Sequence, residues 1–206
     1  MALNELRDLY VHELRDLYNA EKQITKALPK MIKAASHDEL RSAFEEHLEV
    51  TREQMSRLEQ IFEALGERPS GPKCKGMEGL LEEGKDMMEE DAEPSVCDAA
   101  LIVGAQTVEH YEIAGYGSVR TFAEMLGETQ ADRLLDRTLR EEEETDRRLT
   151  EIAKRVNEDA EVGGDTEEDE DVNMDMPARG RSSSKAGSSS RSRSGSKAGA
   201  GARSRR

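Results

Sequence analysis

Apolar side chains recur every three or four residues in four long stretches of the chain. This spacing is typical of a helix that buries one face. Only a few residues separate the first two stretches, and only a few separate the last two, so each pair is expected to form an antiparallel hairpin. The four predicted helices cover residues 3–35, 37–65, 95–126 and 130–157.

The segment between the two hairpins is long and begins with residues that break helices, among them Gly66, Pro69 and Pro72. A shorter apolar stripe then predicts a helix from Met77 to Glu90. A crossover of this length lets the third long helix run in a direction that a tight turn would forbid. The chain is therefore predicted to be all-α, a ferritin-like antiparallel four-helix bundle with a short extra crossover helix between the second and third long helices.

Several helix ends carry recognisable signals. Asn4 is the expected N-cap of the first helix, and Ser36-x-x-Glu39 forms a capping box before the second. Gly66 and Gly127 follow the last apolar positions of the second and third long helices, where a glycine commonly ends a helix.

Each long helix interrupts its apolar stripe with polar residues at a matching depth. Glu21 and Thr51 lie equally far from the first hairpin turn, and Glu112 and Glu142 lie equally far from the turn at Gly127. Residues that are equally far from the turn of an antiparallel hairpin lie at one level. We therefore expect a central polar layer made of Glu21, Gln54, Glu109, Glu112, Glu142 and Asp146, with His47 one turn away.

Several carboxylates in an apolar interior are unfavourable, because each lacks water and raises the pKa of the others. A multivalent cation removes this cost. Oxygen ligands with one imidazole suit iron or manganese better than zinc, so the layer predicts an iron or manganese site that holds one ion or two. The alternative is a hydrogen-bonded polar layer that holds no metal. His47 is equally compatible with a ligand role and with a satisfied core histidine.

Three neighbours of the layer have simpler expected roles. Of the four consecutive glutamates at 141–144, the apolar stripe selects only Glu142 to point inward. His110 is expected to face another helix or solvent. Tyr116 lies one turn from the acidic residues and could hydrogen-bond to them.

The charge of the chain narrows the function classes. The net charge is −15 over 206 residues, which disfavours binding of nucleic acid or anionic membranes by the helical body and favours cations. Cys74 and Cys97 lack the spacing of a metal or redox pair, so both are expected to be free thiols in a reducing compartment. No apolar run could span a bilayer, and no secretory signal is evident, so we expect a soluble cytoplasmic protein.

The end of the chain has a different composition from the helical part. Residues 158–178 are acidic, and residues 179–206 are rich in Ser, Gly, Ala and Arg without a hydrophobic pattern. We expect a helical domain over 1–157 and a disordered tail over 158–206. The basic half could touch DNA phosphates, but a solvated tail is the favoured interpretation.

Five runs resemble the YciE/YciF family of bacterial stress-induced proteins over residues 3–156. They are LYNAEKQITKALPKM, AFEEHLEVT, MEGLLEEG, DAALIVGAQTVEHYEIAGYG and TLREEEETD. The resemblance implies a ferritin-like fold, a rubrerythrin-like metal site and a homodimer, and it implies no particular reaction. A di-iron or iron/manganese centre acting on peroxide or oxygen is one hypothesis. A non-catalytic helical stress or scaffold protein is the other.

One departure from the resemblance concerns the first hairpin. The family often reads HLEET where this chain has His47-Leu48-Glu49-Val50-Thr51, so Val50 removes a carboxylate. Gln54 and Asp146 stand where a ferritin-like Glu-x-x-His pair would place histidine. We therefore expect one ion to bind well and a second to bind weakly.

Overall fold

The computed structural model describes residues 3–163, and this part of the chain contains five helices and no strand. The all-α prediction is confirmed, and the helices begin and end within a few residues of the predicted positions, apart from the last end. The helices are α1 (Leu6–Ala34), α2 (Asp38–Leu65), α3 (Lys75–Glu89), α4 (Pro94–Leu126) and α5 (Thr129–Gly163).

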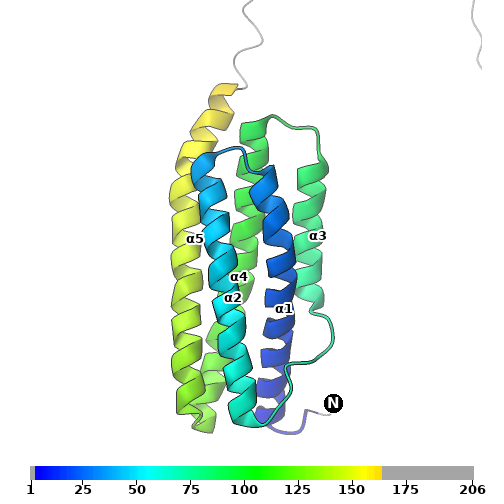
Figure 1. The fold of residues 1–206 in the computed structure, drawn as a ribbon, viewed down its shortest axis with the longest axis vertical. Coiled ribbons are helices and arrows are strands. Elements are labelled where there is room, and N and C mark those ends of the chain that lie inside the picture. Colours follow the sequence, from blue (N-terminus) through cyan, green and yellow to red (C-terminus); the bar gives the residue numbers. More distant parts are fainter. Residues whose placement is uncertain (1–2, 164–206) are drawn as a thin grey trace, which may run out of the picture. The chain divides into compact units, whose positions relative to one another are not determined.

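Two antiparallel hairpins form the bundle, α1 with α2 and α4 with α5 (Figure 1). The hairpins pack through α1 against α4 and through α2 against α5. The crossover helix α3 lies against α1 and α4 and returns the chain to the end of the bundle where α2 begins (Figure 1). Consequently α4 runs parallel to α2, which is the arrangement expected from the long connection.

Glycine ends two of the long helices as predicted. Gly66 and Gly127 are the C-caps of α2 and α4, with φ of 67° and 76°. This left-handed backbone conformation favours glycine, because a Cβ atom would meet the following carbonyl.

Two predicted helix starts were wrong in detail. The N-cap of α1 is Glu5 rather than Asn4, and the Asp8 carboxylate accepts a hydrogen bond from the Asn4 backbone N–H at 2.9 Å. The N-cap of α2 is His37, and Ser36 donates its backbone N–H and its hydroxyl to Asp98 instead of capping. Asp98 is buried on α4, so a distant carboxylate replaces the local capping box.

The last helix was predicted to end too early. It runs to Gly163 rather than 157, because the charged residues after Val156 offer neither proline nor glycine until that point. The remainder of the predicted tail, and with it the DNA-binding hypothesis, lies outside the described residues. No helix in the described part is long and apolar enough to cross a membrane. Cys74 and Cys97 are both free, buried and half-buried respectively, as predicted.

The apolar core consists of two clusters, one toward each end of the bundle. The first includes Ile24, Leu28, Phe44, Leu101, Ile102, Leu149 and Ile152. The second includes Tyr10, Leu14, Leu58, Phe62, Tyr116, Val119 and Leu135. Between the two lies a set of buried polar residues from all four long helices, which we call the polar layer: Glu21, His47, Thr51, Gln54, Arg57, Glu109, Glu112, Thr138 and Glu142.

Candidate metal centre

The polar layer takes its acids from three of the four long helices. Glu21 comes from α1, Glu109 and Glu112 lie one turn apart on α4, and Glu142 comes from α5. All four side chains are buried, with residue exposures between 0% and 2%. Each occupies a position on the inward face of its helix that an apolar residue would otherwise fill, which explains the interruption of the apolar stripes.

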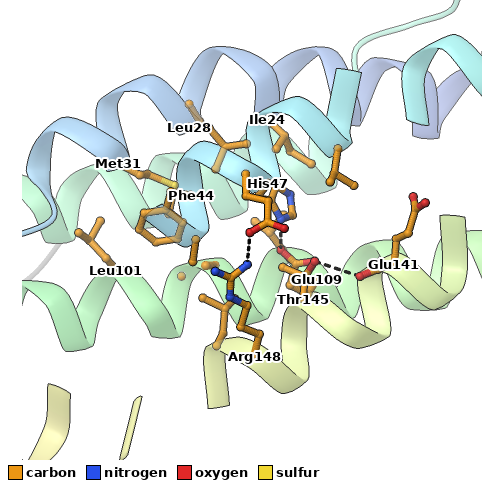
Figure 2. Close-up of a pocket in the computed structure, with 18 of the residues that line it drawn as sticks. Ile24, Leu28, Met31, Phe44, His47, Leu101, Glu109, Glu141, Thr145 and Arg148 are labelled. Atoms are coloured by element: carbon orange, nitrogen blue, oxygen red, sulfur yellow. Dashed lines mark hydrogen bonds and ion pairs between the residues drawn. The ribbon is translucent and has the colours of Figure 1, made fainter. Parts of the chain in front are cut away.

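Four of the predicted residues converge on a single point. Ligand atoms of His47, Glu109, Glu112 and Glu142 all lie within 4.8 Å of one another. His47 Nδ1 lies 3.4 Å from Glu109 Oε1, and Figure 2 shows the two side chains facing each other across α2 and α4. His47 was expected one turn away from the layer, but its imidazole lies together with the three glutamates in this group of four.

Glu21 and Gln54 lie beside this group of four. The Tyr116 hydroxyl donates a hydrogen bond to Glu21 Oε1, as the position of Tyr116 one turn beyond Glu112 suggested. The Gln54 amide nitrogen lies 3.4 Å from Glu141 Oε2, while its Oε1 atom has no hydrogen-bond partner. Gln54 thus presents a free acceptor within the layer.

Many carboxylate oxygens of the layer have no hydrogen-bond partner. Because buried polar atoms are nearly always satisfied in proteins, such a concentration of orphaned acceptors points to a positively charged group that would bind them. The set suits a cation, because all of these atoms accept and none donates when the acids are ionised. The orphaned atoms are Glu21 Oε2, Gln54 Oε1, Glu109 Oε2, Glu112 Oε1 and both carboxylate oxygens of Glu142.

Burial and mutual repulsion raise the pKa values of the buried glutamates above their ordinary range. Burial, and then the neighbouring carboxylates, raise the pKa of Glu109 and Glu112 well above the usual value. The pKa of Glu21 is raised in the same way, against the opposing effect of the Tyr116 hydrogen bond. Burial raises the pKa of Glu142 to about 7, and the charge of the Arg57 guanidinium partly offsets this rise.

His47 is uncharged in these surroundings. Burial lowers its pKa to about 4, so the imidazole is neutral at pH 7. A neutral imidazole keeps a lone pair for a metal ion, whereas an imidazolium has none. The protonation state of His47 therefore favours a ligand role over a charge-neutralising one.

The sequence pattern did not identify Arg57 as part of the layer. Its guanidinium is buried and makes two hydrogen bonds to Glu141, at 2.6 and 2.8 Å, and one to the Thr138 hydroxyl at 2.8 Å. Arg57 also lowers the pKa of Glu21 and Glu142 through its charge. Its position one turn after Gln54 was the available signal, but an arginine on that face is normally read as solvent-exposed.

Asp146 lies at the exposed edge of the bundle rather than in the group of four. Its side chain is 24% exposed and accepts a hydrogen bond from Gln106 Nε2 at 3.0 Å. His110, 70% exposed, lies with Nε2 at 3.3 Å from the same carboxylate. His110 therefore faces solvent and a neighbouring helix, as expected, and Asp146 is its partner.

The chain is similar to a family of known sequences and to solved structures. The family described as a domain of unknown function, DUF892, matches residues 5–161. Protein YciF of Escherichia coli K12 is 45% identical over 163 residues, which is 78% of this chain and 98% of YciF. The family match covers nearly all of the described helices, from the start of α1 to two residues before the end of α5.

Solved structures agree with the described helices. The crystal structure of the E. coli stress protein YciF matches with a TM-score of 0.73 and 44% identity, over 75% of this chain and 98% of that one. The YcfI structure from Rhodopseudomonas palustris matches with a TM-score of 0.70 and 44% identity, over 72% and 94% of the two chains. The XCC3681 protein from Xanthomonas campestris is 21% identical, with a TM-score of 0.63 over 78% and 99%, and supports the fold alone. The chain therefore belongs to the DUF892 family, the family of the stress protein YciF.

Proposed function

We propose that the polar layer is a metal centre for iron or manganese and that the chain is a ferritin-like stress protein whose metal reacts with peroxide or oxygen. The observation that supports this proposal is the set of six buried acceptor oxygens without hydrogen-bond partners, gathered beside a neutral imidazole. Oxygen ligands with a single nitrogen are the donor set that iron and manganese accept readily.

One ion would be held by the group of four, His47, Glu109, Glu112 and Glu142. A second would take Glu21 and the free Gln54 oxygen, and would share Glu112 or Glu142 with the first. Four ionised glutamates match the charge of two divalent ions. Because Val50 supplies no carboxylate and Asp146 lies at the edge, the second ion is expected to bind more weakly.

The bound metal would supply the electron-transfer chemistry, and the chain would set its surroundings. The four acids are almost completely buried, and the scarcity of water around them strengthens the attraction between ions and carboxylates. Arg57 favours the ionised form of Glu21 and Glu142, the form that binds metal. The Tyr116 hydroxyl fixes the orientation of Glu21.

The competing function is a non-catalytic helical protein in which the polar layer fixes the register of the helices. Part of the layer supports it, because Tyr116 with Glu21, and Arg57 with Glu141 and Thr138, form a hydrogen-bonded network without metal. This alternative leaves the six orphaned oxygens without an explanation.

Metal analysis of the full-length protein as isolated tests the proposal, together with titration by ferrous and manganous ions and measurement of peroxide consumption. We expect one tightly bound ion and a weaker second. Glu109→Gln with Glu142→Gln should abolish binding, and Glu143→Gln with Glu144→Gln, two exposed neighbours on the same helix, should not. A protein that binds neither metal would contradict the proposal. A metal-loaded protein without peroxide turnover would remove only its catalytic part. Light scattering by the same purified protein tests whether the chain forms the expected homodimer.

A further inference from the structure

A cavity of about 820 Å³ lies inside the bundle beside the polar layer. All five helices contribute to its wall, and Figure 2 shows Met31, Phe44 and Leu101 toward one end, with His47 and Glu109 further along. The volume falls within the range of about 300–1,000 Å³ that small-molecule sites occupy. The interior wall is mainly apolar and includes Ile24, Leu28, Met31, Phe44, Leu80, Leu101, Val108 and Leu149.

One buried acid of this wall carries an oxygen without a hydrogen-bond partner. Glu109 is 2% exposed and lines the cavity, and its Oε2 atom has no hydrogen-bond partner. His47 is the other buried polar side chain in the wall. A ligand that fills the cavity therefore meets one place where a polar group is satisfied, with apolar surface over most of the remaining length.

The rim of the cavity is charged, but its charges are already balanced. Each charged rim residue has an oppositely charged partner, so a charged ligand would find no free counter-charge. The pairs are Arg148 with Glu46, Arg137 with Glu53 and Glu141, Arg140 with Asp136, and Glu144 with Arg147.

We propose that this cavity binds an uncharged straight-chain molecule that ends in a hydroxyl group, of the chemistry of a long-chain primary alcohol. The alkyl chain lies along the apolar wall, and the hydroxyl hydrogen-bonds to the orphaned oxygen of Glu109. A hydroxyl can donate and accept, so it satisfies Glu109 whether or not the acid is protonated. The binding uses no metal ion, but an ion at the centre would compete for the same Glu109 carboxylate, so the proposal concerns the metal-free protein and is tested there.

Displacement of a neutral fluorophore, N-phenyl-1-naphthylamine, from the full-length metal-free protein tests the proposal. We expect 1-hexanol, 1-octanol and 1-decanol to displace it with an affinity that rises about fourfold per added methylene, the gain from moving a methylene out of water. Decanoate and decylamine have a chain of the same length with a charged end, and both should bind at least tenfold more weakly than 1-decanol.

Two cavity-filling variants and one matched control locate the site. Ala27→Phe and Ala105→Phe add a ring to the cavity wall from α1 and α4, and each should weaken 1-decanol at least tenfold. Ala114→Phe adds the same ring at an exposed position of α4 outside the cavity and should leave the affinity unchanged. Circular dichroism melting confirms that each variant folds, and Ala27, which is half-buried, tolerates a ring more easily than Ala105.

Three results would overturn the proposal. The first is an absence of displacement by any alcohol. The second is binding of decanoate or decylamine as tight as that of 1-decanol, which would contradict the balanced rim. The third is a folded Ala27→Phe protein with unchanged affinity, which would place the ligand elsewhere. Loss of metal binding in a Glu142→Gln variant tests the metal centre separately, because Glu142 belongs to the group of four but does not line the cavity.

Discussion

The Arg57 guanidinium holds the Glu141 carboxylate through two parallel hydrogen bonds at the edge of the polar layer. The pair joins α2 to α5, the side of the bundle where the two hairpins meet away from the crossover helix. Because this guanidinium is hydrogen-bonded to Glu141, it brings positive charge near the four buried acids and leaves their carboxylate oxygens unoccupied. Arg57 is therefore a partial substitute for a cation when no metal is bound.

Replacing Arg57 should destabilise the metal-free protein. Arg57→Met leaves Glu141 and Thr138 without their donor, and the loss is about 2 kcal/mol, since Glu141 reaches solvent and is not fully stranded. Arg57→Lys keeps the charge but not the bidentate geometry, and should lose about half as much. Urea unfolding of chelator-treated protein at pH 7 measures both. Equal stability of the three proteins would show that the pair contributes nothing.

The acids of the group of four should stabilise the protein only when metal is present. In metal-free protein, Glu109→Gln with Glu142→Gln removes two unfavourable buried acids, so the melting temperature should rise. Ferrous or manganous ion at a hundred times its Kd should stabilise the wild type by about 2.7 kcal/mol, roughly 5–10 °C, and leave the double variant unchanged. Differential scanning calorimetry with and without metal measures this. A metal-independent melting temperature in the wild type would favour the register-fixing alternative.

The contribution of Glu142 to the stability of the metal-free protein should fall as the pH rises from about 4.5 to 7. Glu142 has a pKa of about 7 in the folded protein and 4.5 as the reference, so between these values the folded chain holds a proton that the unfolded chain has lost. Its stabilising contribution is complete below pH 4.5 and falls by roughly 1.4 kcal/mol per pH unit inside the window.

His47 has the opposite effect in part of this range. Its pKa is about 4 when folded and 6.5 as the reference, so its contribution grows as the pH rises from 4 to 6.5. Comparing the wild type with Glu142→Gln by urea unfolding at several pH values cancels the His47 effect. We expect the stability of the variant relative to the wild type to rise by roughly 1.4 kcal/mol per pH unit between about pH 4.5 and 7. Identical profiles would contradict a raised Glu142 pKa.

Tyr116→Phe should destabilise the protein by about 1.5 kcal/mol, because it removes the donor to a fully buried Glu21 oxygen. Tyr10→Phe is the matched control. Tyr10 is equally buried, but its hydroxyl has no hydrogen-bond partner, so losing it should be neutral or stabilising. Thermal unfolding of the two metal-free variants decides the matter, and an equal loss in both would show that the Glu21 contact is unimportant.

Asp98→Ala should cost about 3 kcal/mol. The Asp98 carboxylate accepts hydrogen bonds from the Ser36 hydroxyl and from the backbone N–H groups of Ser36 and His37, so one buried side chain holds the turn between α1 and α2 against α4. Asp86→Ala, an exposed acid on α3, should change the stability by less than about 0.5 kcal/mol. Urea unfolding of the two variants provides the comparison.

Periodicity and turn chemistry were sufficient to predict the bundle. The apolar stripes are local, and Gly66 and Gly127 mark helix ends that need no distant partner. The start of α2 was predicted less well, because Ser36 is satisfied by Asp98, a residue 62 positions away in the sequence. No pattern within one helix reveals such a partner.

The candidate site was also predicted only in part: the positions along the helices were correct, but some side-chain directions were not. Counting from the hairpin turns placed Glu21, Glu112 and Glu142 at one level, and the structure brings their helices together there. The counting determines the height of a residue but not its rotation about the helix axis. Asp146 has the correct height and the wrong rotation, so it faces Gln106 at the edge. Arg57 was missed because its partners lie on another helix.

The division of the apolar core by the polar layer has a consequence for how the bundle opens. Without metal, the two apolar clusters are joined across their shared boundary mainly by helix backbone and a few hydrogen bonds, so we expect amide hydrogens at the two ends to exchange with solvent in separate steps. An ion bound by residues of several helices would link the two apolar clusters across the polar layer. Both ends would then open only together.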